Sequence, residues 1–357
     1  MVHSSELENL KGREVMRRRK LGLVGLMVAL AGTAALAVGL STGSAKSQAG
    51  YKIFFLPKTT TIPVFTQNGI GAKKAAKELG DTITYNGPTD VSGPKQVPFI
   101  DAATRQHYDA IVISTPDPNA VAPALKRAAA KGVKVVSFDG DTAPDSRTIF
   151  VAPSTNSLIG ALEVQWLGQE INYNGEFAIL SATPTSPNQN TWIKFMKVEL
   201  KKAKYKNMKL VKIAYGNDDP TDSAKQTQAL LQAYPNLKGI IAPTSVGIQA
   251  AAQELQQEGK CKTVQLTGLG LPNDMRKYVK AGCANKFGLW DEQNLGYLST
   301  YVAHYVVAGK LTGAIGQTFK AGKLGSFKVV VSDGNKPVVV LGPPLAFTPQ
   351  NIDKFHF

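Results

Sequence analysis

Two carboxylates separated by a single residue, Asp139 and Asp141, end the segment K-V-V-S-F-D-G-D at residues 134–141. The preceding Val135, Val136 and Phe138 are β-branched or aromatic residues, which are typical of a buried strand. In an open parallel sheet, ligands bind at the carboxyl ends of the strands. The pair therefore indicates a binding position for polar ligand groups. Taken alone, Asp141 fits a turn cap and Asp139 a solvated loop equally well.

Comparable polar and aromatic residues follow other predicted strands. Carboxylates, amides and an ammonium group can hydrogen-bond neighbouring hydroxyl groups, and aromatic rings can cover the apolar faces of a sugar or polyol. Each residue alone fits a cap or core position, but the set together predicts a polar small-molecule cleft. The candidate ligand contacts are Lys58, Phe65, Asp139, Asp141, Asn188, Gln189, Trp192, Pro243, Thr244, Ser245, Trp290 and Asp291.

Motifs of covalent or cofactor chemistry are missing from the sequence. Gly69 and Gly71 open a predicted helix, but the third glycine and the acidic residue of a dinucleotide site do not follow. There is neither a phosphate-binding G-x-x-x-x-G-K-[ST] loop nor a G-x-S-x-G nucleophile elbow. Two cysteines and four dispersed histidines do not form a metal-binding pattern. We therefore expect no enzyme, no catalytic residue, no metal and no cofactor.

The elements that position these residues alternate regularly between strand and helix, which predicts parallel, doubly wound α/β sheets. Strands are expected at 51–56, 82–85, 110–114, 133–138, 148–151, 176–180, 210–214, 239–242, 263–267 and 287–290. Helices are expected at 65–79, 91–106, 119–131, 155–171, 188–204, 220–233, 246–257, 273–281 and 295–308. A β-rich tail closes the chain at 326–357.

Chain length and this rhythm together predict two lobes joined by a hinge. With 357 residues, 43% of them apolar, the chain can bury a large core. We expect crossings near Val151, near Trp290 and within the tail. The predicted N-terminal lobe comprises 50–151 and 291–325, and the predicted C-terminal lobe comprises 152–290 and 326–357.

The net charge of +15 is high but is not organised for nucleic-acid binding. The lysines between 194 and 206 are scattered as on a solvated helix face, and an arginine-rich arm is missing. A basic surface could also favour anionic polymers of the cell envelope. We expect no nucleic-acid partner.

Residues 1–49 are expected to be an export signal. Arg17, Arg18, Arg19 and Lys20 precede an uncharged, mostly apolar stretch at 21–40, and small residues around 47–49 fit a cleavage site. Because this stretch is long for a signal, an uncleaved membrane anchor is the alternative. Lipid attachment is excluded, since there is no cysteine near the junction. Either reading places the folded part outside the cytoplasm, in the periplasm or on the outer face of the membrane.

Cys261 and Cys283 each precede a strand-like run, and a single predicted helix separates the two runs. Adjacent parallel strands would bring the two thiols close together, and an exported protein meets oxidising conditions. A structural disulfide is therefore expected, with two free thiols as the alternative.

At these residues the chain resembles a type I periplasmic solute-binding protein of an ABC importer, in the branch of rhamnose-binding proteins and autoinducer-2 receptors. The resemblance extends from Tyr51 to Phe357. It rests on F-L-P-K at 55–58, Y-N-G-P-T at 85–89, Y-D-A-I-V-I-S at 108–114, F-D-G-D-T at 138–142, N-Q-N-T-W at 188–192, A-Y-P-N-L-K-G-I-I-A-P at 233–243, F-G-L-W-D at 287–291 and N-I-D-K-F at 351–355. It implies a monomer that closes over a sugar and delivers it to an ABC permease.

The same resemblance bears on the ligand. Autoinducer-2 receptors bind through a Lys, two Asp, a Gln, a Pro and an Ala, and Lys58, Asp139, Gln189 and Pro243 match this set. Asn188 stands where the second Asp is expected, and Ser245 stands where the Ala is expected. F-M-K-V-E-L and L-T-G-L-G-L-P are more similar to rhamnose-binding relatives. L-rhamnose or a similar deoxy sugar is therefore the first expectation, and an autoinducer-2 receptor for uptake or sensing is the alternative.

A transcriptional repressor can share this fold, but it requires an N-terminal helix-turn-helix. The N-terminal residues instead carry the export pattern described above.

Overall fold

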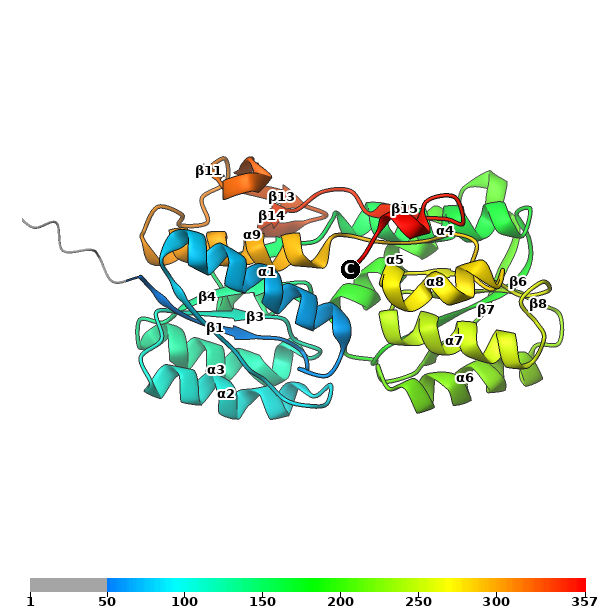
Figure 1. The fold of residues 1–357 in the computed structure, drawn as a ribbon, viewed down its shortest axis with the longest axis horizontal. Coiled ribbons are helices and arrows are strands. Elements are labelled where there is room, and N and C mark those ends of the chain that lie inside the picture. Colours follow the sequence, from blue (N-terminus) through cyan, green and yellow to red (C-terminus); the bar gives the residue numbers. More distant parts are fainter. Residues whose placement is uncertain (1–49) are drawn as a thin grey trace, which may run out of the picture. The chain divides into compact units, whose positions relative to one another are not determined.

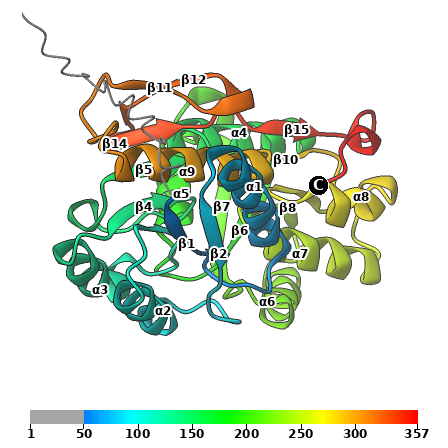
Figure 2. The ribbon, with the colours of Figure 1, turned by 60° about the vertical axis from the view of Figure 1, so that its left-hand side comes forward.

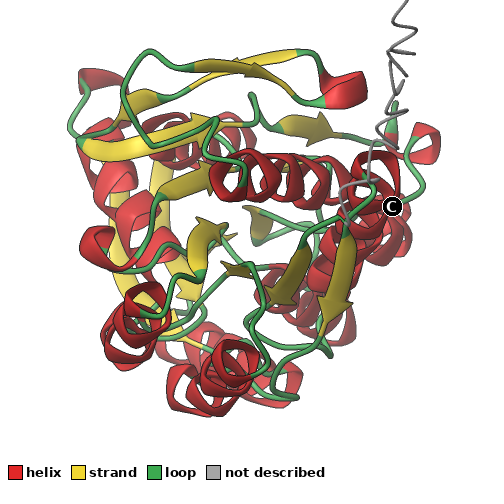
Figure 3. Ribbon diagram, turned by 90° about the vertical axis from the view of Figure 1, so that its left-hand side faces the viewer, coloured by secondary structure: helices red, strands yellow, loops and turns green. Residues whose placement is uncertain are grey.

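The computed structural model describes residues 50–357, so the predicted signal or anchor at 1–49 lies outside the described residues. Two α/β lobes, each built on a mostly parallel sheet, make up this part of the chain (Figure 1). Helices cover the sheets on both faces (Figure 3). Within 50–357, none of the helices combines the length and the apolarity needed to cross a bilayer. The predicted doubly wound, two-lobed α/β fold is confirmed.

The first lobe contains a seven-stranded sheet with the order β13-β14-β5-β4-β3-β1-β2. The five strands of this sheet that come first in the chain are parallel to one another. They are β1 (Lys52–Leu56), β2 (Thr82–Tyr85), β3 (Ala110–Ile113), β4 (Lys134–Phe138) and β5 (Ile149–Ala152). The helices of this lobe are α1 (Pro63–Leu79), α2 (Gly93–Arg105), α3 (Pro118–Ala130) and α9 (Glu292–Val307).

Alternate residues of the central strands pack on opposite faces of this sheet. Ile53 and Phe55 of β1 join the apolar cluster that includes α1 and α9, whereas Phe54 and Leu56 join the cluster that includes α2 and α3. A parallel sheet buried on both faces needs such continuous apolar strands. The carboxyl ends of β1, β3 and β4 are consequently held in register at one edge of the lobe.

The second lobe contains a four-stranded parallel sheet with the order β7-β6-β8-β9. These strands are β6 (Asn174–Ser181), β7 (Asn207–Tyr215), β8 (Leu237–Ala242) and β9 (Gln265–Gly268). The helices are α4 (Asn156–Glu170), α5 (Pro187–Glu199), α6 (Pro220–Ala233), α7 (Ser245–Gln257) and α8 (Pro272–Lys280). Strand β10 (Phe287–Leu289) contacts Leu269 beyond β9 through a parallel bridge and pairs antiparallel with β15 (Leu345–Phe347).

The tail differs from its predicted place. Residues 326–357 were expected in the second lobe, but β13 (Val330–Ser332) and β14 (Asn335–Val340) extend the first sheet, so that prediction is wrong for 330–340. Strand β14 pairs in parallel with β5, whose edge would otherwise stay open. A short hairpin of β11 (Thr318–Lys320) and β12 (Ser326–Lys328) precedes them. The chain therefore crosses between lobes after β5, after β10 and after β14.

Helices α1 and α9 lie side by side on the first lobe (Figures 1 and 2). Two glycines allow this close approach. A Cβ atom at Gly71 would lie 1.8 Å from the carbonyl oxygen of Gln293, and a Cβ atom at Gly296 would lie 2.0 Å from that of Asn68. The backbones of the two helices are therefore in direct contact at this point, which fixes the start of α9 against the middle of α1.

Candidate ligand-binding site

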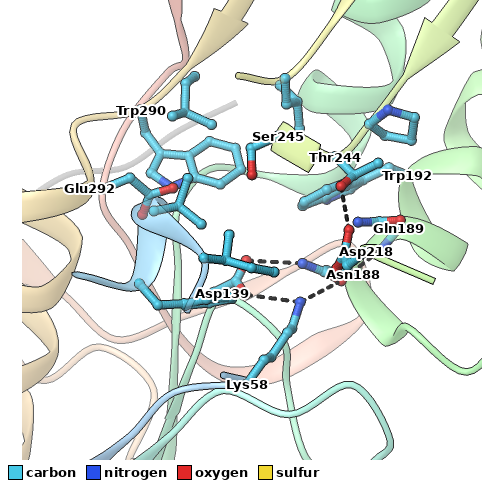
Figure 4. A pocket seen from close by; sticks show the side chains of 16 residues that line it. Lys58, Asp139, Asn188, Gln189, Trp192, Asp218, Thr244, Ser245, Trp290 and Glu292 are labelled. Carbon is cyan, nitrogen blue, oxygen red and sulfur yellow. Dashed lines mark hydrogen bonds and ion pairs between the residues drawn. The ribbon is translucent and has the colours of Figure 1, made fainter. Parts of the chain in front are cut away.

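A cavity lies between the two lobes, at the carboxyl ends of both sheets (Figure 4). It contains about 460 Å³ of space that is free of protein atoms, including the part that is open to solvent. Both lobes contribute polar side chains to its wall: Lys58, Asp139 and Glu292 from the first lobe, and Asn188, Gln189, Asp218, Thr244 and Ser245 from the second.

An ion pair between Lys58 and Asp139 forms the first-lobe wall of the cavity. Lys58 follows β1 and Asp139 follows β4, and the intervening strand β3 ends next to Ser114. The Lys58 Nζ atom lies 3.0 Å from Asp139 Oδ2, and the two side chains are only 3% and 12% exposed. The Ser114 hydroxyl donates to the same oxygen at 2.8 Å. Asp139 has a φ of 51°, a left-handed conformation that Asp tolerates better than most residues.

Asn188, in the first turn of α5, joins the two lobes through both ends of its amide. Its Nδ2 donates to Asp139 Oδ1 at 3.0 Å, and its Oδ1 accepts from Lys58 Nζ at 3.4 Å. The neighbouring Gln189 is held by its Oε1 atom, which accepts from the Ser181 hydroxyl at 2.8 Å and from the Ala182 N–H at 2.6 Å. No partner within 50–357 takes the Nε2 hydrogens of Gln189, so they remain available for a ligand.

Aromatic rings form the apolar part of the wall. Phe65, Trp192 and Trp290 line the cavity, and the two indole rings meet edge to face with their centres 5.9 Å apart. Trp192 is fixed by its Nε1 atom, which donates to Asn156 Oδ1 at 2.8 Å. Flat apolar surfaces beside hydrogen-bonding groups suit the mixed faces of a sugar ring.

Two acidic residues of the cavity, Asp218 and Glu292, were missed by sequence reasoning. Asp218 lies in the turn after β7 and accepts a hydrogen bond from the Thr244 hydroxyl. Burial raises the pKa of Asp218, and the Lys58 charge opposes that rise. Burial, with the Asp139 charge, raises the pKa of Glu292 well above its usual range. The signal in the sequence was a polar residue close behind a predicted strand. Asp218 did not give this signal, because it lies three residues beyond the end of β7.

Ten of the twelve predicted contacts line this cavity. They are Lys58, Phe65, Asp139, Asn188, Gln189, Trp192, Pro243, Thr244, Ser245 and Trp290.

The structure does not bring Asp141 and Asp291 to the cavity. Asp141 accepts from the Arg147 guanidinium at 2.6 and 2.8 Å and from Asn335 at 2.8 Å, so it anchors the start of β14. Asp291 is the N-cap of α9 and accepts from the Asn294 N–H at 2.9 Å. The Asp-x-x-Asn spacing is a helix-cap pattern, and it was the signal that could have pointed to Glu292 instead.

Away from the cavity, Cys261 and Cys283 are joined by a disulfide, with their Cα atoms 4.3 Å apart. The bond ties the middle of the α7–β9 loop to the loop that follows α8. Across residues 50–357, no group of three or more His, Cys, Asp or Glu side chains is arranged to hold a metal ion.

Comparison with known proteins agrees with this architecture. The family described as "Periplasmic binding protein domain" matches residues 53–311. The chain belongs to the periplasmic binding protein family. It is therefore a binding protein, and the prediction that it is not an enzyme is confirmed.

Several proteins of known ligand are similar to it. An ABC transporter solute-binding protein from Clostridium phytofermentas, solved with bound L-rhamnose, is 33% identical with a TM-score of 0.84, over 86% of this chain and 98% of that one. LsrB from Clostridium saccharobutylicum in complex with AI-2 is 27% identical with a TM-score of 0.81, over 86% and 100% of the two chains. The D-apiose import binding protein of Paraburkholderia graminis is 26% identical over 254 residues, 69% of this chain and 78% of that protein.

Proposed function

We propose that this periplasmic binding protein is the extracytoplasmic sugar-binding component of an ABC transporter, with L-rhamnose or a similar deoxy sugar as its ligand. The observation that carries the proposal is the cavity between the lobes, where hydrogen-bonding groups and three aromatic rings converge. The similar C. phytofermentas protein with bound L-rhamnose supports the choice of ligand.

The binding mechanism would be hinge closure. The three crossings leave the lobes free to move relative to each other about the segments after β5, β10 and β14. Lys58 and Asp139 would hold sugar hydroxyl groups from one lobe, and Asn188, Gln189 and Ser245 from the other. The closed form would then be recognised by the permease subunits, because only that form presents both lobes in fixed relative positions.

Autoinducer-2 is the second candidate ligand. The similar LsrB protein in complex with AI-2 favours it, as does the presence of Lys58, Asp139, Gln189 and Pro243 in the cavity wall. Asn188 and Ser245 argue against it. Asn188 carries no charge, and the Ser245 hydroxyl adds volume at the wall.

A thermal-unfolding panel tests the proposal. The purified protein would be mixed with L-rhamnose, other pentoses and hexoses, polyols and autoinducer-2. A ligand that binds only the native state, at 100 times its dissociation constant, adds about 2.7 kcal/mol to the free energy of unfolding. That corresponds to a rise in the melting temperature of roughly 5 °C or more. A rise with L-rhamnose or another deoxy sugar supports the proposal, a rise with autoinducer-2 alone replaces it with the second candidate, and no rise with any sugar refutes it.

A further inference from the structure

Glu292 is a buried acid whose position is set by a neighbouring amide. It is the first residue of α9, lines the cavity and is 4% exposed. The Nδ2 atom of Asn68, in the middle of α1, donates to the Glu292 carbonyl oxygen at 2.8 Å and to Glu292 Oε2 at 2.7 Å. Asn68 is itself only 1% exposed. Because α1 and α9 also touch through Gly71 and Gly296, the carboxyl group has little freedom to move.

The other half of this carboxyl group is unused within the protein. Glu292 Oε1 accepts no hydrogen bond from residues 50–357, whereas Oε2 is engaged by Asn68. Beside it lies the buried indole Nε1 of Trp290, which opposes the rise that burial causes in the pKa of Glu292 but makes no hydrogen bond of normal geometry within that range. Figure 4 shows the two side chains together at one end of the cavity. A buried donor without a full hydrogen bond is unfavourable, so a ligand atom that completes the bond favours binding.

A hydroxyl group can satisfy both groups at once, since it donates one hydrogen bond and accepts others. When Glu292 is ionised, the hydrogen of this hydroxyl group would bond to Glu292 Oε1, and its oxygen would accept from Trp290 Nε1.

An anionic ligand group is disfavoured by the residues within 50–357 that line the cavity. Three of them are acidic (Asp139, Asp218 and Glu292), and the one basic residue, Lys58, is already paired with Asp139. The ligand class that fits is a neutral polyhydroxy compound.

We propose that Glu292 is a specificity-determining residue, which together with the indole N–H of Trp290 takes one hydroxyl group of the sugar. This inference rests on the proposed function, since it requires a sugar in the cavity. It adds that sugar acids and sugar phosphates are rejected and that one ring hydroxyl is required.

Calorimetric titration with L-rhamnose, and with its monodeoxy derivatives, tests this assignment. Glu292→Gln keeps the size of the side chain. Asn68 continues to donate to the amide oxygen, so an NH₂ group faces the ligand where an acceptor was. Two donors then meet the hydroxyl group, and its proton has no acceptor. Because burial raises the pKa of Glu292, the titration is made at alkaline pH, where more of the wild-type carboxyl group is ionised. There we expect the affinity for L-rhamnose to fall roughly 10- to 100-fold.

Glu258→Gln is the matched control. It makes the same chemical change at an exposed position after α7 that does not line the cavity, so it should change the affinity by less than about threefold. Trp290→Phe keeps an aromatic ring and removes the N–H, so it tests the same hydroxyl group if Glu292→Gln fails to fold.

Three results are expected together. One monodeoxy derivative should bind the wild type more weakly than L-rhamnose does. This loss of affinity should be similar to the loss that Glu292→Gln causes for L-rhamnose itself. The same derivative should lose little more affinity in Glu292→Gln or Trp290→Phe, because the shared hydroxyl group is already missing. L-rhamnonate should give no binding heat. Unchanged affinity of Glu292→Gln, or strictly additive losses for every derivative, would overturn the inference. A wild type that binds no sugar would instead overturn the proposed function.

Discussion

Removing the Asp139 carboxylate should destabilise the protein as well as weaken sugar binding, because Asp139 neutralises a buried cation. The Lys58 ammonium group is 3% exposed and has Asp139 at 3.0 Å and the neutral Asn188 oxygen at 3.4 Å. The informative variant is Asp139→Asn. Asn tolerates the left-handed backbone at this position, whereas Ala would add strain to the loss of charge.

The magnitude follows from the burial of the pair. Breaking a buried ion pair by removing one partner costs about 3–5 kcal/mol, because the remaining charge loses its compensation. The Asp218 carboxyl group also interacts with the Lys58 charge, so the lower end of this range applies here. The Ser114 hydroxyl and the Asn188 amide donate to Asp139 as well, and an amide oxygen would replace only part of that acceptor capacity. We therefore expect Asp139→Asn to lower the free energy of unfolding by about 3 kcal/mol. Lys58→Met should cost a similar amount, since it leaves Asp139 unpaired.

Urea unfolding of the ligand-free protein measures this loss as a shift of the midpoint of about 1 M. The double variant should lose less than the sum of the two single losses, because it leaves no unpaired charge in the pair. Asp145→Asn is the matched control. Its carboxylate pairs with Lys126 on the surface, where the side chains are 68% and 50% exposed, so it should cost less than about 0.5 kcal/mol. If both single variants lost little free energy of unfolding, and the double variant lost the sum of the two, the pair would be neither buried nor coupled in the way that the structure indicates.

Three further predictions concern stability. Both carboxyl oxygens of Glu163, in α4, are buried without a hydrogen-bond partner among residues 50–357, and burial raises the pKa of Glu163 well above the usual range. The protein therefore loses stability as pH rises through the folded pKa of Glu163. Glu163→Leu should stabilise the protein by about 1–3 kcal/mol near pH 8 and by less near pH 4. Equal gains in the melting temperature at the two pH values would contradict this. Gly296→Ala would place a Cβ atom 2.0 Å from a backbone oxygen of α1, and it should cost at least about 2 kcal/mol in urea unfolding. Gly342→Ala should be close to neutral, because its Cβ atom would have no contact within 4 Å in the described part of the chain. Replacing Cys261 and Cys283 by Ser opens a loop of sequence separation 22 and should cost about 3 kcal/mol; a loss below about 1 kcal/mol in thermal unfolding would show that the bond constrains little.

Much of the fold could be predicted because its signals are local. Each central strand is a run of apolar residues, and helices such as α1 and α3 begin at a proline in the first turn and end near a glycine. The choice between sheets is not local. The V-V-V run of β14 would satisfy either sheet, and only the open edge beside β5 assigns it to the first lobe.

The site was predictable to the extent that it follows strand ends. Lys58, Asp139 and Pro243 were found because the carboxyl ends of parallel strands meet at one edge of each sheet. Asp218 and Glu292 were missed because a turn and a helix start, rather than strand ends, bring them to the cavity.

Asp139 and Asp141 illustrate the difference between what the sequence determined and what the tertiary structure decided. The sequence by itself determined that two carboxylates follow β4, since the pattern of apolar residues locates the end of that strand. Only the folded chain decided which of them reaches the cavity. The left-handed backbone at Asp139 and its contact with Lys58 direct one carboxylate towards the other lobe. Arg147 and Asn335, the latter distant in sequence, take the other carboxylate as a structural anchor. Such pairings depend on which segments meet in space, and residue spacing along the chain does not encode that directly.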